Sequence, residues 1–164
     1  MKAAIITVST SVAAGHNEDV SGQALAELAT NAGAEVVAIE VVSDDRTQIE
    51  EALRRHCAPG AGTSFVFTTG GTGLTADDVT PEATRAVIDR DAPGIAEAMR
   101  AESLKHTPMG LLSRGVSGIA GRTLIVNFPG SPKAIGQLFG LIEPVLGHAE
   151  ATLQRERGAR TPGH

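Results

Sequence analysis

The chain has 164 residues, of which 41% are apolar and 20% charged, and its formal net charge is −5. This length suits one domain with a sizeable core, which we assign to residues 1–154, followed by a flexible tail over residues 155–164. The negative charge and an aromatic content of 2%, with neither Trp nor Tyr, argue against a nucleic-acid binder, because such proteins need cations and stacking rings.

Cysteine content and hydropathy favour a cytoplasmic protein without a membrane partner. Cys57 is the single cysteine, so it has no disulfide partner within the chain and no metal-ligand partner at a suitable spacing. The apolar run Ala3–Val8 near the N-terminus is too short for a signal peptide or a membrane span. We therefore expect a reducing, cytoplasmic setting.

Short β-branched runs alternate with helical segments, which is typical of an α/β protein with a mainly parallel sheet. The first half of the chain predicts strands at residues 3–9, 35–42 and 64–69. A helix over residues 21–31 separates the first two strands and ends at Gly33, a residue type favoured just past helix ends. A second helix follows the second strand, with Asp44 or Asp45 as its N-cap.

Prolines mark the helix boundaries in the second half of the chain. Thr80 as N-cap and Pro81 at the first helical position start a helix that runs to about residue 90. Pro93 opens another helix, which ends before Pro108.

The C-terminal third predicts two strands and a long helix. Strand-like runs cover residues 111–119 and 122–127, joined as a hairpin or through a crossover. After Ser131, an apolar stripe predicts the last helix. Pro144 lies within that stripe and predicts either two helices or a kink.

A glycine-rich loop directly after the strand at residues 64–69 is the first candidate site. Its residues are Gly70, Gly71, Thr72 and Gly73. Glycines allow positive φ and close approach of a ligand, and the freed N–H groups can bind an anion such as a phosphate. An ordinary strand-to-helix turn explains the same pattern, since the established phosphate-loop spacings are absent.

A second candidate site, residues 127–133, runs from the end of the last predicted strand through the loop at residues 129–132 into the last helix. Ser131 as N-cap and Pro132 as the first helical residue expose N–H groups at the positive end of the helix dipole, beside Lys133. This is either a plain helix start or an anion site. Because ligands bind at the carboxyl ends of strands in an open α/β sheet, the two loops together predict a crevice for a phosphorylated ligand.

Four acidic residues also lie at predicted strand-to-helix junctions: Asp44, Asp45, Asp77 and Asp78. Carboxylates repel bound phosphates unless a divalent cation lies between them, and Mg²⁺ prefers such hard oxygen ligands. This favours metal-assisted phosphoryl or nucleotidyl transfer. Helix capping is the alternative, since Asp45 with Gln48 resembles a capping box and Asp78 precedes a helix start.

One long motif favours nucleotidyl transfer over helix capping. Residues 68–83 read TTGGTGLTADDVTPEA, and further matching segments stand at 93–94, 102–104, 112–114 and 124–132. Together they resemble the signature of the molybdopterin-binding family, specifically its molybdopterin adenylyltransferases, and the resemblance covers nearly the whole chain. It implies a three-layer α/β/α fold with a mainly parallel central sheet, and a homotrimer.

The resemblance also implies an activity, the transfer of AMP from Mg-ATP to the terminal phosphate of molybdopterin, which gives adenylyl-molybdopterin and pyrophosphate ahead of molybdate insertion. Asp44 and Asp78 fall on the two aspartates needed for catalysis in the family, and we assign Mg²⁺ binding to both. ATP is then the co-substrate, and the molybdate-inserting enzyme is a partner downstream. Thr10 stands where the family commonly has Asp or Asn, and Asp77 is an extra carboxylate.

The same resemblance implies the substrate contacts. Thr72, Ser103 and Ser113 match positions that contact the pterin, although solvent exposure or local capping would explain both serines without a ligand. The loop at residues 129–132 matches the nucleotide side. The full expected set is Gly70, Gly71, Thr72, Gly73, Ser103, Ser113, Pro129, Gly130, Ser131 and Pro132.

Two other functions compete with adenylyl transfer. A relative within the family could bind molybdopterin for storage or as a scaffold without efficient catalysis, but such relatives lose one or both acids. A domain of nicotinamide-nucleotide salvage proteins shares the glycine loop, but those chains are typically longer.

Overall fold

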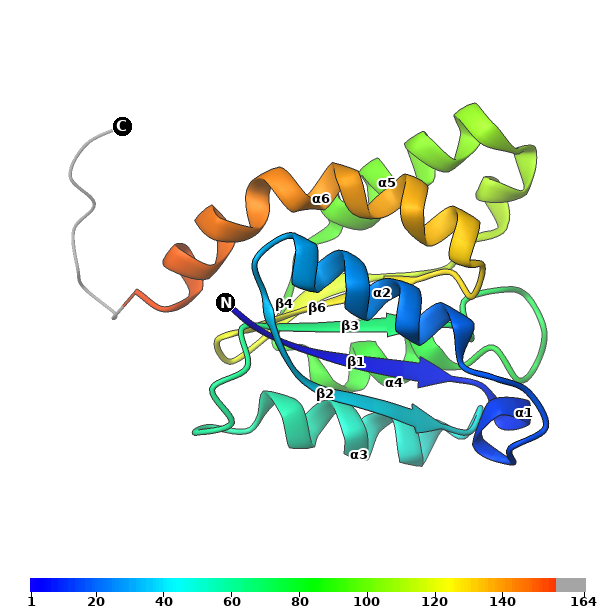
Figure 1. The fold of residues 1–164 in the computed structure, drawn as a ribbon, viewed down its shortest axis with the longest axis horizontal. Helices are drawn as coiled ribbons and strands as arrows, with labels where there is room; N and C mark the ends of the chain where they lie inside the picture. Colours follow the sequence, from blue (N-terminus) through cyan, green and yellow to red (C-terminus); the bar gives the residue numbers. More distant parts are fainter. Residues whose placement is uncertain (156–164) are drawn as a thin grey trace.

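Six strands form one sheet, and helices cover both of its faces in the computed structural model, which describes residues 1–155 (Figure 1). The strands are β1 (Lys2–Val8), β2 (Glu35–Val42), β3 (Phe65–Thr69), β4 (Arg90–Asp91), β5 (Ser117–Ala120) and β6 (Thr123–Phe128). Their order across the sheet is β2-β1-β3-β6-β5-β4. The four strands β2, β1, β3 and β6 are parallel to one another. β5 pairs antiparallel with β6, and β4 pairs antiparallel with β5. The expected three-layer α/β/α fold is confirmed.

The helices divide between the two faces of the sheet (Figure 1). One face carries α2 (Val20–Asn31), α5 (Pro93–His106) and α6 (Pro132–Leu153), and the other carries α3 (Arg46–Cys57) and α4 (Thr80–Val87). The short helix α1 (Thr10–Ala13) directly follows β1, and a 3-10 helix, η1 (Pro108–Leu112), follows α5.

All four phenylalanines of the chain lie in the core between the sheet and α6. Phe65 and Phe67 come from β3, Phe128 from β6 and Phe139 from α6, and none is more than 1% exposed. The rings of Phe67 and Phe139 meet edge to face, with centroids 5.8 Å apart. Burial of each ring contributes about 1.5–3 kcal/mol, so this cluster holds β3 beside β6 and places the loops that follow them.

Two predicted helix starts differ in detail from the structure. Asp45 is the N-cap of α3, where its Oδ1 accepts a hydrogen bond from the Gln48 N–H at 2.9 Å, so Asp44 is not the cap. The prediction that Thr80 caps the next helix is wrong, because Val79 occupies the N-cap position of α4 and no side chain caps it. The Thr80 hydroxyl instead donates to the Gly70 carbonyl oxygen at 3.0 Å, which ties the helix start to the glycine loop.

The predicted strand over residues 111–119 is wrong in its first part. η1 covers Pro108–Leu112, because Thr107 caps it by accepting a hydrogen bond from the Met109 N–H at 3.3 Å. Only Ser117–Ala120 pairs as β5, and it forms a hairpin with β6 rather than a crossover. The helix α1 and the two-residue strand β4 are not predicted from the sequence.

Of the two outcomes predicted at Pro144, two helices or a kink, the first is wrong. α6 continues through Pro144, whose ring nitrogen leaves the Gly140 carbonyl without its helical partner. Ile142 and Leu146 lie on either side of this proline and are both buried against the core, which stabilises the helix across the missing hydrogen bond.

The predicted tail at residues 155–164 lies outside the described residues, apart from Arg155. Within residues 1–155 no helix combines the length and the apolar character needed to cross a membrane. Cys57 is a free, half-buried thiol at the end of α3, and burial raises its pKa to about 11. A thiol with such a high pKa is a poor nucleophile at neutral pH.

Candidate functional site

The two candidate loops lie side by side at the carboxyl ends of the neighbouring strands β3 and β6. The Gly70 N–H donates to the Phe128 carbonyl oxygen at 3.2 Å, and the Thr69 hydroxyl donates to the Pro129 carbonyl oxygen at 2.9 Å. A Cβ atom on Gly130 would lie 3.6 Å from the Gly70 Cα atom. The sheet order therefore joins two loops that stand far apart in the sequence.

Gly70 and Gly71 are the two positions in the first loop where glycine is required. Both have positive φ, +96° and +62°. A Cβ atom on Gly70 would lie 2.3 Å from the Val8 carbonyl oxygen, and one on Gly71 would lie 2.4 Å from the Thr80 hydroxyl oxygen. The loop is therefore packed tightly between the end of β1 and the start of α4.

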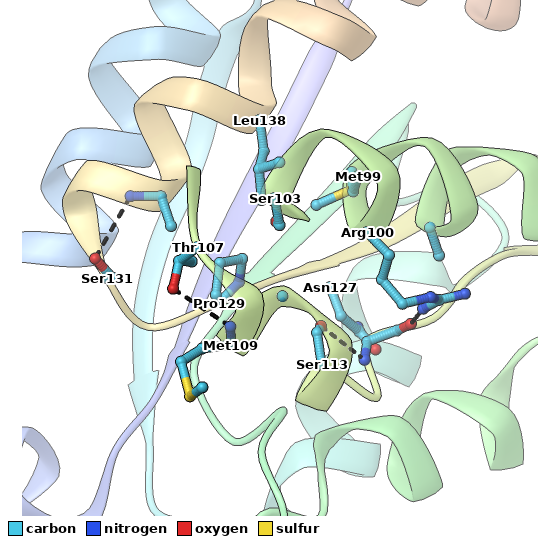
Figure 2. A pocket seen from close by; sticks show the side chains of 14 residues that line it. Met99, Arg100, Ser103, Thr107, Met109, Ser113, Asn127, Pro129, Ser131 and Leu138 are labelled. Carbon is cyan, nitrogen blue, oxygen red and sulfur yellow. Dashed lines mark hydrogen bonds between the residues drawn. The ribbon is translucent and has the colours of Figure 1, made fainter. Parts of the chain in front are cut away.

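A first cavity, of about 240 Å³, opens between α5, η1 and the start of α6 (Figure 2). Met99 and Leu138 give it an apolar side, and Asn127 contributes polar atoms. Four of the residues expected to bind substrate line it: Ser103, Ser113, Pro129 and Ser131. An apolar cavity with a few convergent polar groups is the usual form of a small-molecule site.

The serines of this cavity differ in how their hydroxyl groups are used. Ser113 accepts a hydrogen bond from the Gly115 N–H at 3.4 Å, and Ser131 is the N-cap of α6, as predicted, accepting from the Ala134 N–H at 3.4 Å. The Ser103 hydroxyl has no hydrogen-bond partner among residues 1–155 and is half-buried at the cavity wall. Of the three, Ser103 is therefore the most available to a ligand.

A second cavity, of about 260 Å³, lies where the two loops meet the end of β1 and the start of α2. Gly70, Gly130 and Pro132 line it. Successive residues of the second loop thus alternate between the two cavities, since Pro129 and Ser131 line the first. The remaining candidate residues line neither cavity: Asp44, Gly71, Thr72, Gly73 and Asp78.

Asp44 follows β2 and is held by Thr10, which follows β1. The main-chain N–H and the hydroxyl of Thr10 both donate to Asp44 Oδ2, at 2.7 and 2.8 Å, and the Asp44 N–H donates back to the Thr10 hydroxyl oxygen at 3.0 Å. The second oxygen, Oδ1, accepts no hydrogen bond from any residue that the structure describes. Thr10 therefore orients this carboxylate and leaves one oxygen free.

Asp78 is held in the same way by Thr75. The Thr75 N–H and hydroxyl donate to Asp78 Oδ2, at 2.8 and 2.6 Å. The hydroxyl hydrogen bond is the main cause that lowers the pKa of Asp78 below its usual range, aided by the N–H groups of Thr75 and Gly73 and by the charge of Arg114, and opposed by partial burial. Asp78 is therefore ionised at neutral pH. It does not cap α4.

The carboxylate oxygens of Asp44 and Asp78 are donors of the kind that suits an ion with further ligands from its substrate. Within residues 1–155, no group of three or more His, Cys, Asp or Glu side chains lies close enough together to hold a metal ion. Two carboxylates suffice for Mg²⁺ when phosphate and water oxygens complete its coordination, which is how this ion binds at nucleotide sites. The donor atoms of Asp44 and Asp78 fit that case.

Asn127 lies in the second candidate site, but the sequence predicted no role for its side chain. Its amide nitrogen donates to the hydroxyl oxygens of Thr68 and Thr84, both at 3.0 Å, and its side-chain oxygen accepts from the Val116 N–H at 3.2 Å. This buried network joins β3, β6 and α4 beneath the first cavity. A lone amide at the end of an apolar strand was the only signal that the sequence offered.

Comparisons with known proteins agree on one family. The family described as "Probable molybdopterin binding domain" matches residues 4–148. The chain is 37% identical over 144 residues to a molybdopterin adenylyltransferase of Helicobacter pylori, a match that covers 87% of this chain and 81% of that protein. It is 38% identical over 147 residues to the molybdenum cofactor synthesis protein cinnamon of Drosophila melanogaster, covering 88% of this chain but only 24% of that protein.

Solved structures give the same result. The molybdopterin biosynthesis enzyme MoaB of Thermus thermophilus superposes with a TM-score of 0.86 at 43% sequence identity. The match covers 93% of this chain and 95% of that chain, so the two share their whole architecture.

Proposed function

The chain belongs to the molybdopterin-binding-domain family, and on that premise we propose that it catalyses adenylyl transfer from ATP to the terminal phosphate of molybdopterin. The products are adenylyl-molybdopterin and pyrophosphate, and the domain that carries the activity spans residues 1–154. The observation that carries the proposal is the presence of both acids, Asp44 and Asp78, each held by a threonine that follows a parallel strand, Thr10 after β1 and Thr75 after β3.

The two cavities suit the two substrates. The first, with its apolar wall and the free Ser103 hydroxyl, accommodates the pterin. The second adjoins the loop at residues 129–132, where the N-terminus of α6 and the exposed Lys133 attract the phosphates of ATP. Because one loop forms a wall of both cavities, the terminal phosphate of molybdopterin and the α-phosphate of ATP meet near it.

In the reaction, an oxygen of the molybdopterin phosphate attacks the α-phosphorus of ATP. The new P–O bond forms as the bond to the β-phosphate breaks, and pyrophosphate leaves. Both substrates are anions. Asp44 and Asp78 would hold Mg²⁺, which would supply the positive charge that reduces the repulsion between the substrates. Thr10 and Thr75 orient the two carboxylates before the substrates bind, which lowers the cost of positioning them.

The proposal is tested by the products formed from ATP and molybdopterin. We expect the purified protein with Mg²⁺ to yield adenylyl-molybdopterin and pyrophosphate, both identified by mass spectrometry. Tight binding of molybdopterin without any adenylylated product would contradict the proposal and indicate a storage or scaffold role. Turnover of a nicotinamide nucleotide instead would indicate a salvage enzyme.

We further propose that the active form is a homotrimer in the cytoplasm. Several large apolar side chains are exposed on the single chain, among them Leu74 at 64%, Met109 at 61% and Leu111 at 70%. Exposed apolar side chains of this size are typical of an interface between subunits. We expect sedimentation at micromolar concentration to give the mass of three chains, and a monomer alone would contradict the trimer.

The product also implies a partner downstream. Adenylyl-molybdopterin is the species into which molybdate is inserted, so we propose that the molybdate-inserting enzyme receives it from this protein. The free thiol of Cys57 is consistent with the reducing compartment in which such a transfer takes place.

A further inference from the structure

Arg114 joins two parts of the proposed site that are far apart in the sequence. It follows Ser113, a residue of the first cavity, in the loop between η1 and β5. Its main-chain N–H donates to the Thr72 carbonyl oxygen at 2.9 Å. Its guanidinium donates through Nε to the Gly73 carbonyl oxygen at 2.7 Å and through Nη2 to the Asp78 carbonyl oxygen. All three acceptors belong to the glycine loop or to the segment that leads from it to α4.

An ion pair with Glu82, in the first turn of α4, completes the contacts of the guanidinium. Arg114 Nη1 lies 2.6 Å from Glu82 Oε1, and Nη2 lies 3.4 Å from Oε2. The side chains are 34% and 38% exposed, so the ion pair alone adds little to stability. Its effect is to fix the plane of the guanidinium, which then presents its remaining N–H groups to the two carbonyl oxygens.

The segment at residues 73–78 depends on Arg114 for its position. Apart from the bonds to Arg114, the hydrogen bonds of this segment within the described chain run between its own residues, chiefly Thr75 and Asp78. Leu74 is 64% exposed on the single chain and adds little packing within the subunit. Without the guanidinium, the segment would be fixed within the subunit only at its ends, and the carboxylate of Asp78 would vary in its distance from the cavity.

The other side of the Arg114 loop is fixed to the wall of the first cavity. Arg100 of α5 donates from Nη1 to the Gly115 carbonyl oxygen at 2.8 Å (Figure 2). The Gly115 N–H in turn donates to the Ser113 hydroxyl oxygen at 3.4 Å. Residues 113–115 therefore connect the cavity wall to the segment that carries Asp78.

We propose that Arg114 is a positioning residue for adenylyl transfer, which holds Asp78 at a fixed distance from the substrate in the first cavity. The inference rests on the proposed function and adds to it a residue that touches no reacting atom. Lysine cannot take its place, because a single ammonium group cannot donate at once to two carbonyl oxygens and a carboxylate that lie around a planar guanidinium.

The test is the Arg114→Lys variant, which keeps the positive charge. We expect kcat to fall by about 100-fold, as for a misplaced catalytic group, while the KM for molybdopterin stays within about threefold of the parental value because the cavity itself is retained. Arg55→Lys is the matched control, since it alters another Arg–Glu pair, with Glu40, between α3 and β2. It should leave kcat unchanged.

A double variant separates positioning from general stability. If Arg114 acts through Asp78, adding Arg114→Lys to Asp78→Asn should cause no further loss of rate. A kcat of Arg114→Lys close to the parental value, or losses that multiply in the double variant, would overturn the inference. If Arg114→Lys melts below the assay temperature, Glu82→Gln takes its place, because it loosens the guanidinium without removing it. Its kcat should then fall with KM retained, and an unchanged kcat would also overturn the inference.

The experiments distinguish failure of this inference from failure of the proposed function. If the parental protein forms no adenylyl-molybdopterin, adenylyl transfer itself is wrong, and Arg114 has no such reaction to support. If the parental protein is active and Arg114→Lys is equally active, adenylyl transfer stands and the role of Arg114 is refuted.

Discussion

Asp78→Asn is expected to leave a folded protein that binds molybdopterin but forms little adenylyl-molybdopterin. The substitution is nearly isosteric, and the amide oxygen of Asn can still accept both hydrogen bonds from Thr75. What it removes is the negative charge that we propose binds Mg²⁺ beside the phosphates of the substrates. Loss of such a preorganised charge reduces rates by roughly 100- to 1000-fold, and we expect a decrease of at least this size in kcat.

Stability should change little, because Asp78 is not a helix cap. α4 has no side-chain cap, and Asp78 is only half-buried. Substitutions at such positions are usually within about 0.5 kcal/mol. Thermal melting and equilibrium binding of molybdopterin should therefore match the parental protein. A large fall in melting temperature would mean that the loop, rather than the charge, had been lost.

Asp77→Asn is the matched control for this prediction. Asp77 is the adjacent carboxylate, it is exposed, and its side chain has no hydrogen bond to the rest of the described chain. The same change of charge one residue away should leave kcat near the parental value. Equal losses in both variants would show that net charge near the glycine loop matters, and not Asp78 as a ligand. Parental activity in Asp78→Asn would refute the assignment altogether.

The lowered pKa of Asp78 gives this prediction a pH dependence. A depressed pKa means that the carboxylate stays ionised as the pH falls through the usual range of Asp, and that protonation occurs only below it. Activity therefore should not decline in mildly acidic solution through this group. Thr75→Val removes the hydroxyl that is the main cause of the shift, so the pKa of Asp78 should rise and the acid limb of the profile should move to higher pH.

The sequence predicted the elements that local patterns determine. β2 matches its predicted range, and Asp45 and Ser131 cap the helices expected of them, because caps and β-branched runs act over a few residues. β4 was missed because its two residues are strand only through pairing with Ile119 and Gly118 of β5. η1 was missed because the apolar pair Leu111 and Leu112 reads equally well as the start of a strand.

In the candidate site, too, some features follow from local patterns and others depend on the packed fold. Loops that follow parallel strands were correctly expected to lie at one edge of the sheet, but only the strand order places β3 beside β6. Thr10 stands 34 positions from Asp44, and Arg114 stands 36 positions from Asp78, so no local pattern links either pair. Contacts of this kind depend on the packed fold and become visible only in the structure.

Removal of divalent metal ions is expected to abolish turnover while affinity for molybdopterin stays nearly the same. In the proposed reaction Asp44 and Asp78 lie near the phosphates of bound ATP, so their two negative charges would repel these phosphates unless a cation lay between them. The first cavity, in contrast, is lined by apolar side chains and neutral hydroxyl and amide groups together with Arg100, so binding of the pterin does not need the ion.

The experiment measures adenylyl-molybdopterin in excess chelator and again after Mg²⁺ is restored, with calorimetry of molybdopterin and of ATP under both conditions. We expect turnover to be lost and then recovered, ATP binding to weaken without the ion, and molybdopterin binding to persist. Asp44→Asn should weaken the response to Mg²⁺, because it neutralises one of the two ligands, whereas Asp45→Asn should not, because Asp45 is the N-cap of α3 and Asn caps a helix nearly as well. Undiminished transfer in excess chelator would refute the metal-binding role of the two acids.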